Sequence, residues 1–165
     1  MAGYDYSRDA LYFVTSCVHD RIHAFGFVKN GKMILNDYGQ IAKQQWYWLK
    51  QQYPYVILHS FVVMPNHIHG IIEINRSVVP AGTGRDAVGT GRDLSLQRYK
   101  IKSLSELMGA YKTTVSKKIH MSGNPDFSWQ RSFHDHIIRD HGEYKRISAY
   151  IRDNPQQWRE DQFYE

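Results

Sequence analysis

Two apolar runs separated by only three residues constrain the fold of this chain more than any other feature. The runs are "YVILHSFVV" (55–63) and "HIHGIIEI" (67–74), with Met64, Pro65 and Asn66 between them. Both are rich in β-branched and aromatic residues, which favour strands. So short a connection makes two strands antiparallel neighbours. We therefore expect a sheet built around this pair.

Further strands and helices are predicted on both sides of the pair. Strands are expected over "LYFVTSCV" (11–18) and "SFHDHIIR" (132–139), and Asn30-Gly31 between two short apolar runs indicates a hairpin. Helices are expected between Asn36 and Pro54, from Ser103 to Ile119, and over 142–153. Pro155 then favours the start of a short terminal helix.

With the early hairpin set aside, the order is strand, helix, strand, strand, helix, strand and helix. This is the split βαβ order of a ferredoxin-like fold with one helix appended. The predicted class is α+β: an antiparallel sheet with helices on one face and an additional C-terminal helix. A length of 165 residues suits one domain, 1–165.

The stretch 76–100 differs in composition from the rest of the chain. It contains "GTGRDAV" followed at once by "GTGRDLS", a tandem heptad without apolar periodicity. A phosphate-binding glycine loop lies between a strand and a helix, and this repeat does not. We interpret the stretch as a mobile insertion.

Composition limits the compartment and the partners. The first twenty residues lack an apolar core like that of a signal peptide, and no later run reaches bilayer length, so we expect a cytoplasmic protein without a membrane partner. The single cysteine, Cys17, is expected to be a core residue in a reducing compartment. A net charge of +5 and 14% aromatic residues are compatible with a nucleic-acid partner and equally with an ordinary basic surface.

Two histidines one residue apart begin the second apolar run. In a strand, His67 and His69 point to one face, whereas Ile68, Ile72 and Ile74 point to the other and face the core. Two imidazoles side by side suit a metal ion, although a pair of ordinary histidines has the same pattern. A second such pair, His134 and His136, ranks lower because no adjoining turn opens it to solvent.

Two sequence blocks resemble known enzymes. "VVMPNHIHGII" resembles the signature of the HUH endonucleases, in which two histidines flank a hydrophobic residue on a central strand. "WQRSFHDHIIRDHGEYKRISAYIRDNPQQW" (129–158) resembles the C-terminal segment of the REP-associated tyrosine transposases. With the predicted element order, the resemblance covers most of the chain.

The resemblance implies specific site residues. The family's nucleophilic tyrosine corresponds to Tyr150 in the last helix, and its polar metal ligand one turn later corresponds to Asn154. With His67 and His69, Asn154 would hold a divalent ion, which the resemblance implies to be Mg or Mn. Glu73 shares the histidines' face and is a weaker candidate ligand.

The residues alone leave other interpretations open. Tyr150 lies between apolar positions and has the pattern of a core aromatic. Asn154 has the pattern of a helix cap, and Pro155 disfavours helical torsions at Asn154. Tyr111 is a competing nucleophile, although it belongs to the regular apolar stripe of its helix.

Residues for DNA contact are expected among basic and aromatic side chains, which bind phosphates and stack bases. The candidates are Arg131, Lys112, Lys117, Trp129 and Phe133. As a whole, the chain resembles a metal-dependent transposase that cleaves and transfers single-stranded, hairpin-forming DNA through a 5′-phosphotyrosine. The alternatives are a domesticated binder of hairpin DNA and a metal-dependent hydrolase that uses water. The sequence does not choose between a monomer and a homodimer that exchanges the tyrosine helix.

Overall fold

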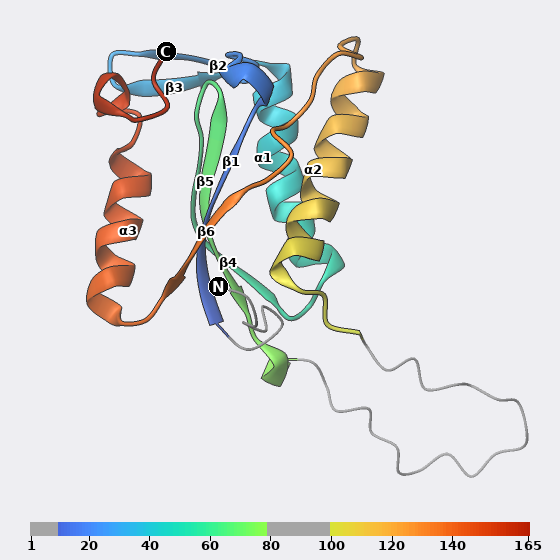
Figure 1. The fold of residues 1–165 in the computed structure, drawn as a ribbon, viewed down its shortest axis with the longest axis vertical. Helices are drawn as coiled ribbons and strands as arrows, with labels where there is room; N and C mark the ends of the chain where they lie inside the picture. The colour runs from blue at the N-terminus through green and yellow to red at the C-terminus, as the bar shows by residue number, and fades with distance from the viewer. Residues whose placement is uncertain (1–9, 79–99) are drawn as a thin grey trace, which may run out of the picture.

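A four-stranded antiparallel sheet forms the centre of the molecule (Figure 1). The computed structural model describes residues 10–78 and 100–165. The strands are β1 (Ala10–Cys17), β4 (Val56–Val63), β5 (His67–Ile74) and β6 (His134–Ile138), in the spatial order β4-β5-β1-β6. Every neighbouring pair is antiparallel, so the predicted ferredoxin-like sheet is confirmed.

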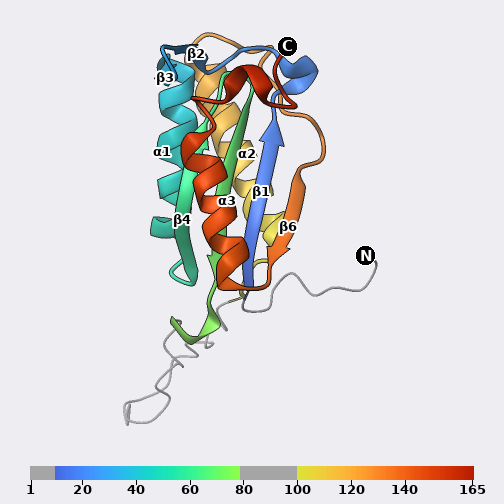
Figure 2. The same ribbon diagram turned by 90° about the vertical axis from the view of Figure 1, so that its left-hand side faces the viewer.

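Helices cover both faces of this sheet. Two of them, α1 (Asp37–Gln52) and α2 (Leu104–Met121), lie on one face, whereas α3 (His141–Asp153) lies on the other (Figures 1 and 2). This is the predicted α+β arrangement with one helix appended. The face that the first two helices leave free is therefore closed by the helix that contains Tyr150.

The helix starts have local causes in the sequence. Asn36 accepts a hydrogen bond from the amide of Gly39, and Asp140 accepts one from Glu143, which satisfies amide groups that the first turn leaves unpaired. Ser103 and Glu106 form a capping box at the start of α2. The apolar stripe of α2 is buried throughout, as its spacing predicts.

For α1, helical spacing alone does not predict which tryptophan is buried. Helical spacing in the sequence predicts one face of α1 formed by Tyr38, Ile41, Ala42, Gln45, Trp48 and Leu49. In the structure Trp46 is the fully buried tryptophan, and Trp48 is only partly buried. The Trp46 ring lies over Gly70 of β5 and stacks on Phe61, with ring centroids 4.5 Å apart. The missing side chain at Gly70 creates this space, which a helical pattern cannot reveal.

The hairpin and the terminal segment lie at one end of the molecule. Strands β2 (Gly26–Lys29) and β3 (Lys32–Leu35) form a separate two-stranded sheet, with positive φ angles at Asn30 (52°) and Gly31 (70°) as the predicted turn requires. The predicted terminal helix is wrong: only a single 3-10 turn, Trp158–Glu160, forms there. The chain turns after Pro155 and packs Trp158 and Phe163 against Cys17 and Met64 instead.

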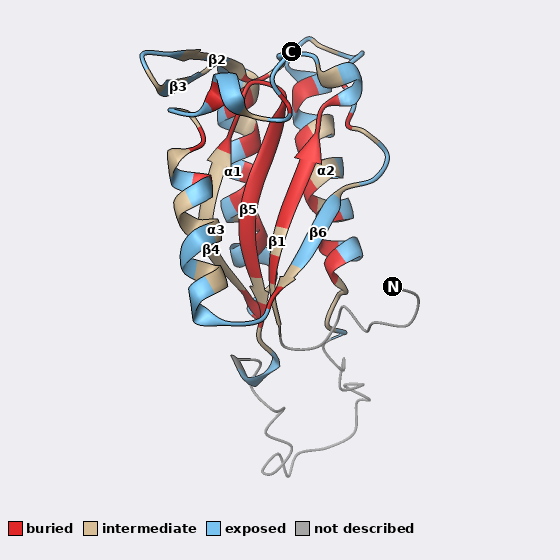
Figure 3. Cartoon of the chain, turned by 60° about the vertical axis from the view of Figure 1, so that its left-hand side comes forward, coloured by how far each residue is buried: buried red, intermediate tan, exposed pale blue. Residues whose placement is uncertain are grey.

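Burial differs sharply among the strands. Figure 3 shows the central strands β1 and β5 largely buried and the edge strand β6 largely exposed. Cys17 is buried, as predicted.

Of the predicted insertion, Arg76–Val78 form a short 3-10 turn, and the doubled heptad lies outside the described residues. Among the helices that the structure describes, none is long and apolar enough to cross a membrane.

Candidate metal centre and tyrosine site

The histidine pair lies on the face of β5 that α3 covers. Ile68, Ile72 and Ile74 point the opposite way into the main core, as the alternation of a strand predicts. His67 and His69 are 0% and 1% exposed. The pair is therefore enclosed by α3 and the terminal segment, with the ring of Phe163 4.6 Å from that of His67.

Hydrogen bonds fix how the two imidazoles are oriented. The amide nitrogen of Asn66 donates to the carbonyl of Phe163 at 2.8 Å, so its amide oxygen is the acceptor for Nδ1 of His67 at 2.7 Å. Nε2 of His67 therefore carries a lone pair. Nδ1 of His69 lies 2.7 Å from the Thr15 hydroxyl, and the two Nε2 atoms lie 3.1 Å apart. Both rings thus turn Nε2 toward a common point.

Burial keeps both rings neutral near pH 7. Desolvation, with a smaller effect of Arg21, lowers the pKa of His67 to about 3. Desolvation and the neighbouring His67 lower the pKa of His69 well below its usual value, against an opposing effect of Asp161. A neutral imidazole is the form that binds a metal ion, so the pair is suited to that role.

Asp161 completes a cluster of three potential ligands, which the sequence did not reveal. One atom from each of His67, His69 and Asp161 lies within 4.8 Å of the others. The Asp161 carboxylate is held by the amide of Phe163 at 2.7 Å and by the side-chain nitrogen of Asn154 at 2.7 Å. Two imidazoles and a carboxylate match the ligand preferences of divalent transition ions. No motif marks Asp161, because it follows α3 in an irregular segment.

Asn154 lies beside this cluster at the end of α3. Its torsions (φ −55°, ψ −41°) stay helical in spite of Pro155, so it lies one turn beyond Tyr150. The side chain is 1% exposed, and its Oδ1 atom has no hydrogen-bond partner in the described part of the chain. A buried acceptor without a partner is costly, and a cation at the three-ligand cluster would satisfy it. The residues present therefore fit a metal ion.

Tyr150 brings a hydroxyl group to the same cluster. Its oxygen lies 3.4 Å from Nε2 of His69 and 3.4 Å from Oδ2 of Asp161. Burial, followed by the charge of Asp161, raises the pKa of Tyr150 to about 12. The side chain is still 36% exposed, because it lines a pocket of about 470 Å³ together with His69, Asn154 and Asp161. A ligand from solvent can thus reach the hydroxyl.

The competing candidates are engaged elsewhere. Tyr111 is fully buried and donates its hydroxyl to the carbonyl of Ala42 at 3.0 Å, which explains its place in the apolar stripe. His134 and His136 are exposed on β6, and His136 pairs with Glu143. Glu73 accepts from Nε2 of His59 at 2.8 Å and is absent from the described ligand cluster.

The predicted DNA-contact residues gather at a different place, beside α2. Lys112, Lys117, Trp129 and Arg131 line a pocket of about 640 Å³, and Phe133 lines an adjoining one. Lys112 donates to the carbonyls of Gln130 and Arg131 at 2.6 and 3.1 Å. Trp129 is only 8% exposed and packs against Tyr111 in the core, so little of its ring is open for stacking.

Comparisons with known proteins give both a relative and a fold. No protein-family model matches the chain. An uncharacterised protein of Haemophilus influenzae is 34% identical over 165 residues, which cover 98% of this chain and 88% of the relative.

Two solved structures resemble the fold. A REP-associated tyrosine transposase bound to a REP hairpin matches with a TM-score of 0.58 and 20% identity, over 96% of this chain and 74% of its own. A candidate transposase from Deinococcus radiodurans R1 matches with a TM-score of 0.50 and 14% identity, over 93% and 95%. These likenesses confirm the expected fold.

Proposed function

Because this chain belongs to one family with the Haemophilus influenzae protein and has the fold of a REP-associated tyrosine transposase, we propose that it cleaves and rejoins single-stranded DNA through Tyr150. The observation that carries the proposal is the place of the Tyr150 hydroxyl, 3.4 Å from both His69 and Asp161 in a pocket open to solvent. A nucleophile beside a set of metal ligands is an arrangement suited to phosphoryl transfer.

His67, His69 and Asp161 would hold a divalent ion, Mg or Mn, with Asn154 as a further oxygen donor. Bound there, the ion would supply positive charge that polarises a non-bridging phosphate oxygen and favours the ionised phenol. The protein's own contribution is to fix the ligands. Asn66 and Thr15 orient the two imidazoles, and the amide of Phe163 orients the carboxylate.

Tyr150 would attack phosphorus in line. The bond from phosphorus to the 3′ oxygen breaks as the bond to the phenol oxygen forms, giving a 5′-phosphotyrosine and a strand with a free 3′-hydroxyl. The Tyr150 hydroxyl donates a hydrogen bond to Asp161, which would receive the phenol proton, and the departing 3′ oxygen would take up a proton from solvent in the open pocket. Attack by the 3′-hydroxyl of a second strand reverses the step and joins the strands without ATP.

A hairpin-forming DNA strand is the proposed substrate. The solved relative is bound to a REP hairpin, and in this chain Lys112, Lys117 and Arg131 gather beside α2. Cationic side chains in one place attract phosphates without regard to sequence. We assign the paired stem to this surface and the unpaired strand to the pocket of Tyr150.

The test is a covalent adduct that survives SDS. The purified protein, with Mn or Mg, is incubated with single strands from the flanks of its own gene that form hairpins. The proposal expects an adduct that disappears in Tyr150→Phe and persists in Tyr47→Phe, which changes an exposed tyrosine of α1. Cut ends without an adduct would indicate a hydrolase that uses water, and hairpin binding without cleavage would indicate a non-catalytic DNA-binding protein.

A further inference from the structure

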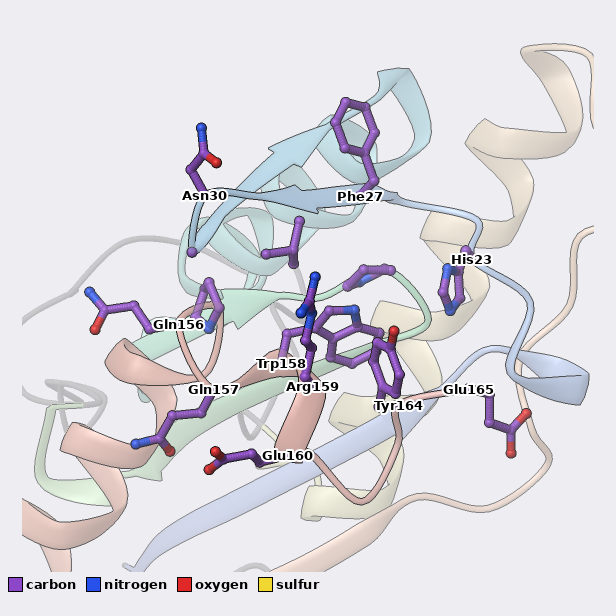
Figure 4. A pocket seen from close by; sticks show the side chains of 14 residues that line it. His23, Phe27, Asn30, Gln156, Gln157, Trp158, Arg159, Glu160, Tyr164 and Glu165 are labelled. Atoms are coloured by element: carbon purple, nitrogen blue, oxygen red, sulfur yellow. The ribbon is translucent and has the colours of Figure 1, made fainter.

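The terminal segment (155–165) supplies one ligand of the candidate metal cluster, Asp161, although its backbone is irregular. The structure describes all of this segment, and it contains one 3-10 turn, Trp158–Glu160. Figure 4 shows the segment below the β2–β3 hairpin. The two histidines of the cluster lie on a strand, whose ladder fixes their backbone. Contacts of the terminal segment with the rest of the fold must instead determine where Asp161 lies.

Phe163 connects this carboxylate to the histidine pair. Its amide donates to Oδ1 of Asp161 at 2.7 Å. Its carbonyl accepts from the side-chain nitrogen of Asn66 at 2.8 Å. Its ring lies 4.6 Å from that of His67 and 5.8 Å from that of His69. A shift of Phe163 would therefore move the carboxylate relative to both imidazoles.

Arg21 holds Phe163 through two contacts with the terminal segment. The guanidinium carbon lies over the Phe163 ring, 5.6 Å from its centroid, and Nη1 donates to Oε1 of Glu165 at 2.8 Å. A cation–π contact and a partly exposed ion pair are each weak. Here they act on two residues of one short segment, so together they restrict where Phe163 can lie.

The backbone around Arg21 is strained in a way that directs its side chain. Asp20 and Arg21 have φ angles of 52° and 51°, in the left-handed region that residues with a Cβ rarely adopt. The amide of Arg21 donates to the carbonyl of Val18 at 3.0 Å, and the amide of Val18 donates to the carbonyl of Asn66 at 2.8 Å. Such strain persists where surrounding structure imposes it. The turn after β1 is thus fixed to Asn66, the residue that also holds Phe163.

We propose that Arg21 is a positioning residue of the metal centre, which acts through Phe163 to keep Asp161 beside the two histidines. The inference rests on the proposed function and adds a residue outside the described ligand cluster. Its charge gives the proposal a distinctive sign. A positive charge near the cluster by itself repels a cation, so removing that charge alone would tighten metal binding. Losing the positioning contacts weakens metal binding instead.

The test is calorimetric titration of the full chain with Mn²⁺, without DNA. Arg21→Gln removes the guanidinium and should weaken Mn²⁺ binding roughly threefold to tenfold, because one cation–π contact and one ion pair are lost. Arg21→Lys keeps the charge and should recover part of the affinity. Arg152→Gln removes an arginine of α3 that pairs with Asp153 and should leave the affinity unchanged.

A second arm repeats the change in Asp161→Asn protein. If Arg21 acts through Asp161, then Arg21→Gln should have no further effect in that background, whereas a general loss of structure would weaken binding in both. If Arg21→Gln does not fold, Glu165→Gln removes the ion pair from its other end and takes its place in both arms.

The inference is overturned if Arg21→Gln binds Mn²⁺ as tightly as the wild type or more tightly. An equal loss in both backgrounds overturns it as well. If the wild type itself binds no Mn²⁺, the metal centre of the proposed function fails and the inference fails with it, so the two failures are distinguishable.

Discussion

At the scale of single residues, the pair of imidazoles is an unusual feature of a buried strand. His67 and His69 are enclosed, neutral and oriented by Asn66 and Thr15, so their Nε2 atoms meet 3.1 Å apart. Asn66 and Thr15 occupy the two Nδ1 atoms, which leaves the two Nε2 atoms facing each other. The proposed cation would bind at these two Nε2 atoms.

Asp161 gives a prediction about metal affinity. Asp161→Asn keeps the size of the side chain and removes its charge, so the affinity for Mn²⁺ should fall by roughly tenfold or more. Isothermal titration of the protein with Mn²⁺ measures this change. Glu160→Gln removes a neighbouring carboxylate that is not in the described ligand cluster and should have little effect. Equal affinities in the wild type and Asp161→Asn would remove Asp161 from the ligand set.

Cys17 gives a prediction about pH. Burial raises the pKa of its thiol from 9.0 to about 11, so the reactive thiolate forms only at higher pH than usual. Because Cys17 is only 2% exposed, iodoacetamide at pH 9 should alkylate it far more slowly in the native protein than in the urea-unfolded protein. Equal rates in the two states would show that the thiol is neither buried nor desolvated.

At the scale of elements, α3 is attached to the sheet by a short hydrogen-bond chain. Nδ1 of His59 lies 3.0 Å from the hydroxyl of Tyr144 on α3, and Nε2 of the same ring lies 2.8 Å from Glu73 on β5. His59 lies where the register of β4 shifts between Leu58 and Phe61, and such irregularities redirect side chains. The chain explains why Glu73, expected near the metal, is occupied elsewhere.

Removing this attachment should loosen α3. Tyr144→Phe loses the hydrogen bond to His59, which should lower the free energy of unfolding by about 1 kcal/mol and speed amide exchange in α3. Urea unfolding and hydrogen–deuterium exchange measure the two effects. Tyr47→Phe, at an exposed site on α1, should change neither. Unchanged exchange in α3 would show that the helix is held by its apolar contacts alone.

Gly70 determines how α1 meets the sheet. A Cβ atom there would lie 2.5 and 2.7 Å from two atoms of the Trp46 ring, so Gly70→Ala should destabilise the fold by about 1–3 kcal/mol. Gly109→Ala on α2 meets no described atom within 4 Å and should stabilise by roughly 0.5–1 kcal/mol. Thermal unfolding of both variants compares them directly. The same sign for both would contradict this packing account.

At the scale of the whole molecule, sequence patterns predicted local elements well and the assembly of the site only in part. Strand alternation placed the histidines on one face, and helix spacing placed Tyr150 and Asn154 together. Asp161 could not be predicted, because it lies in an irregular segment whose sequence has no periodic pattern. The burial of the histidine pair could not be predicted either, since it depends on Trp158 and Phe163 folding back onto the sheet. Long-range packing of this kind leaves no local signal.

At the same scale, the basic pocket beside α2 and the pocket of the candidate nucleophile Tyr150 share no lining residue, so the molecule offers two separate surfaces. A hairpin with an unpaired flank also has two parts. We assign its paired stem to the basic pocket and its single strand to the pocket of Tyr150. The account therefore depends on Tyr150 being the residue that becomes bonded to DNA.

The most direct measurement is to locate the DNA on the protein by mass spectrometry. After reaction with a hairpin-forming strand, nuclease and trypsin digestion should leave a nucleotide on the peptide ISAYIR (147–152), with fragment ions placing it on Tyr150. The account predicts this modification in the wild type and its absence in His67→Ala, because the tyrosine acts beside the metal ligands. A nucleotide found instead on the peptide of Tyr111 (103–112), or on none, would contradict the central claim.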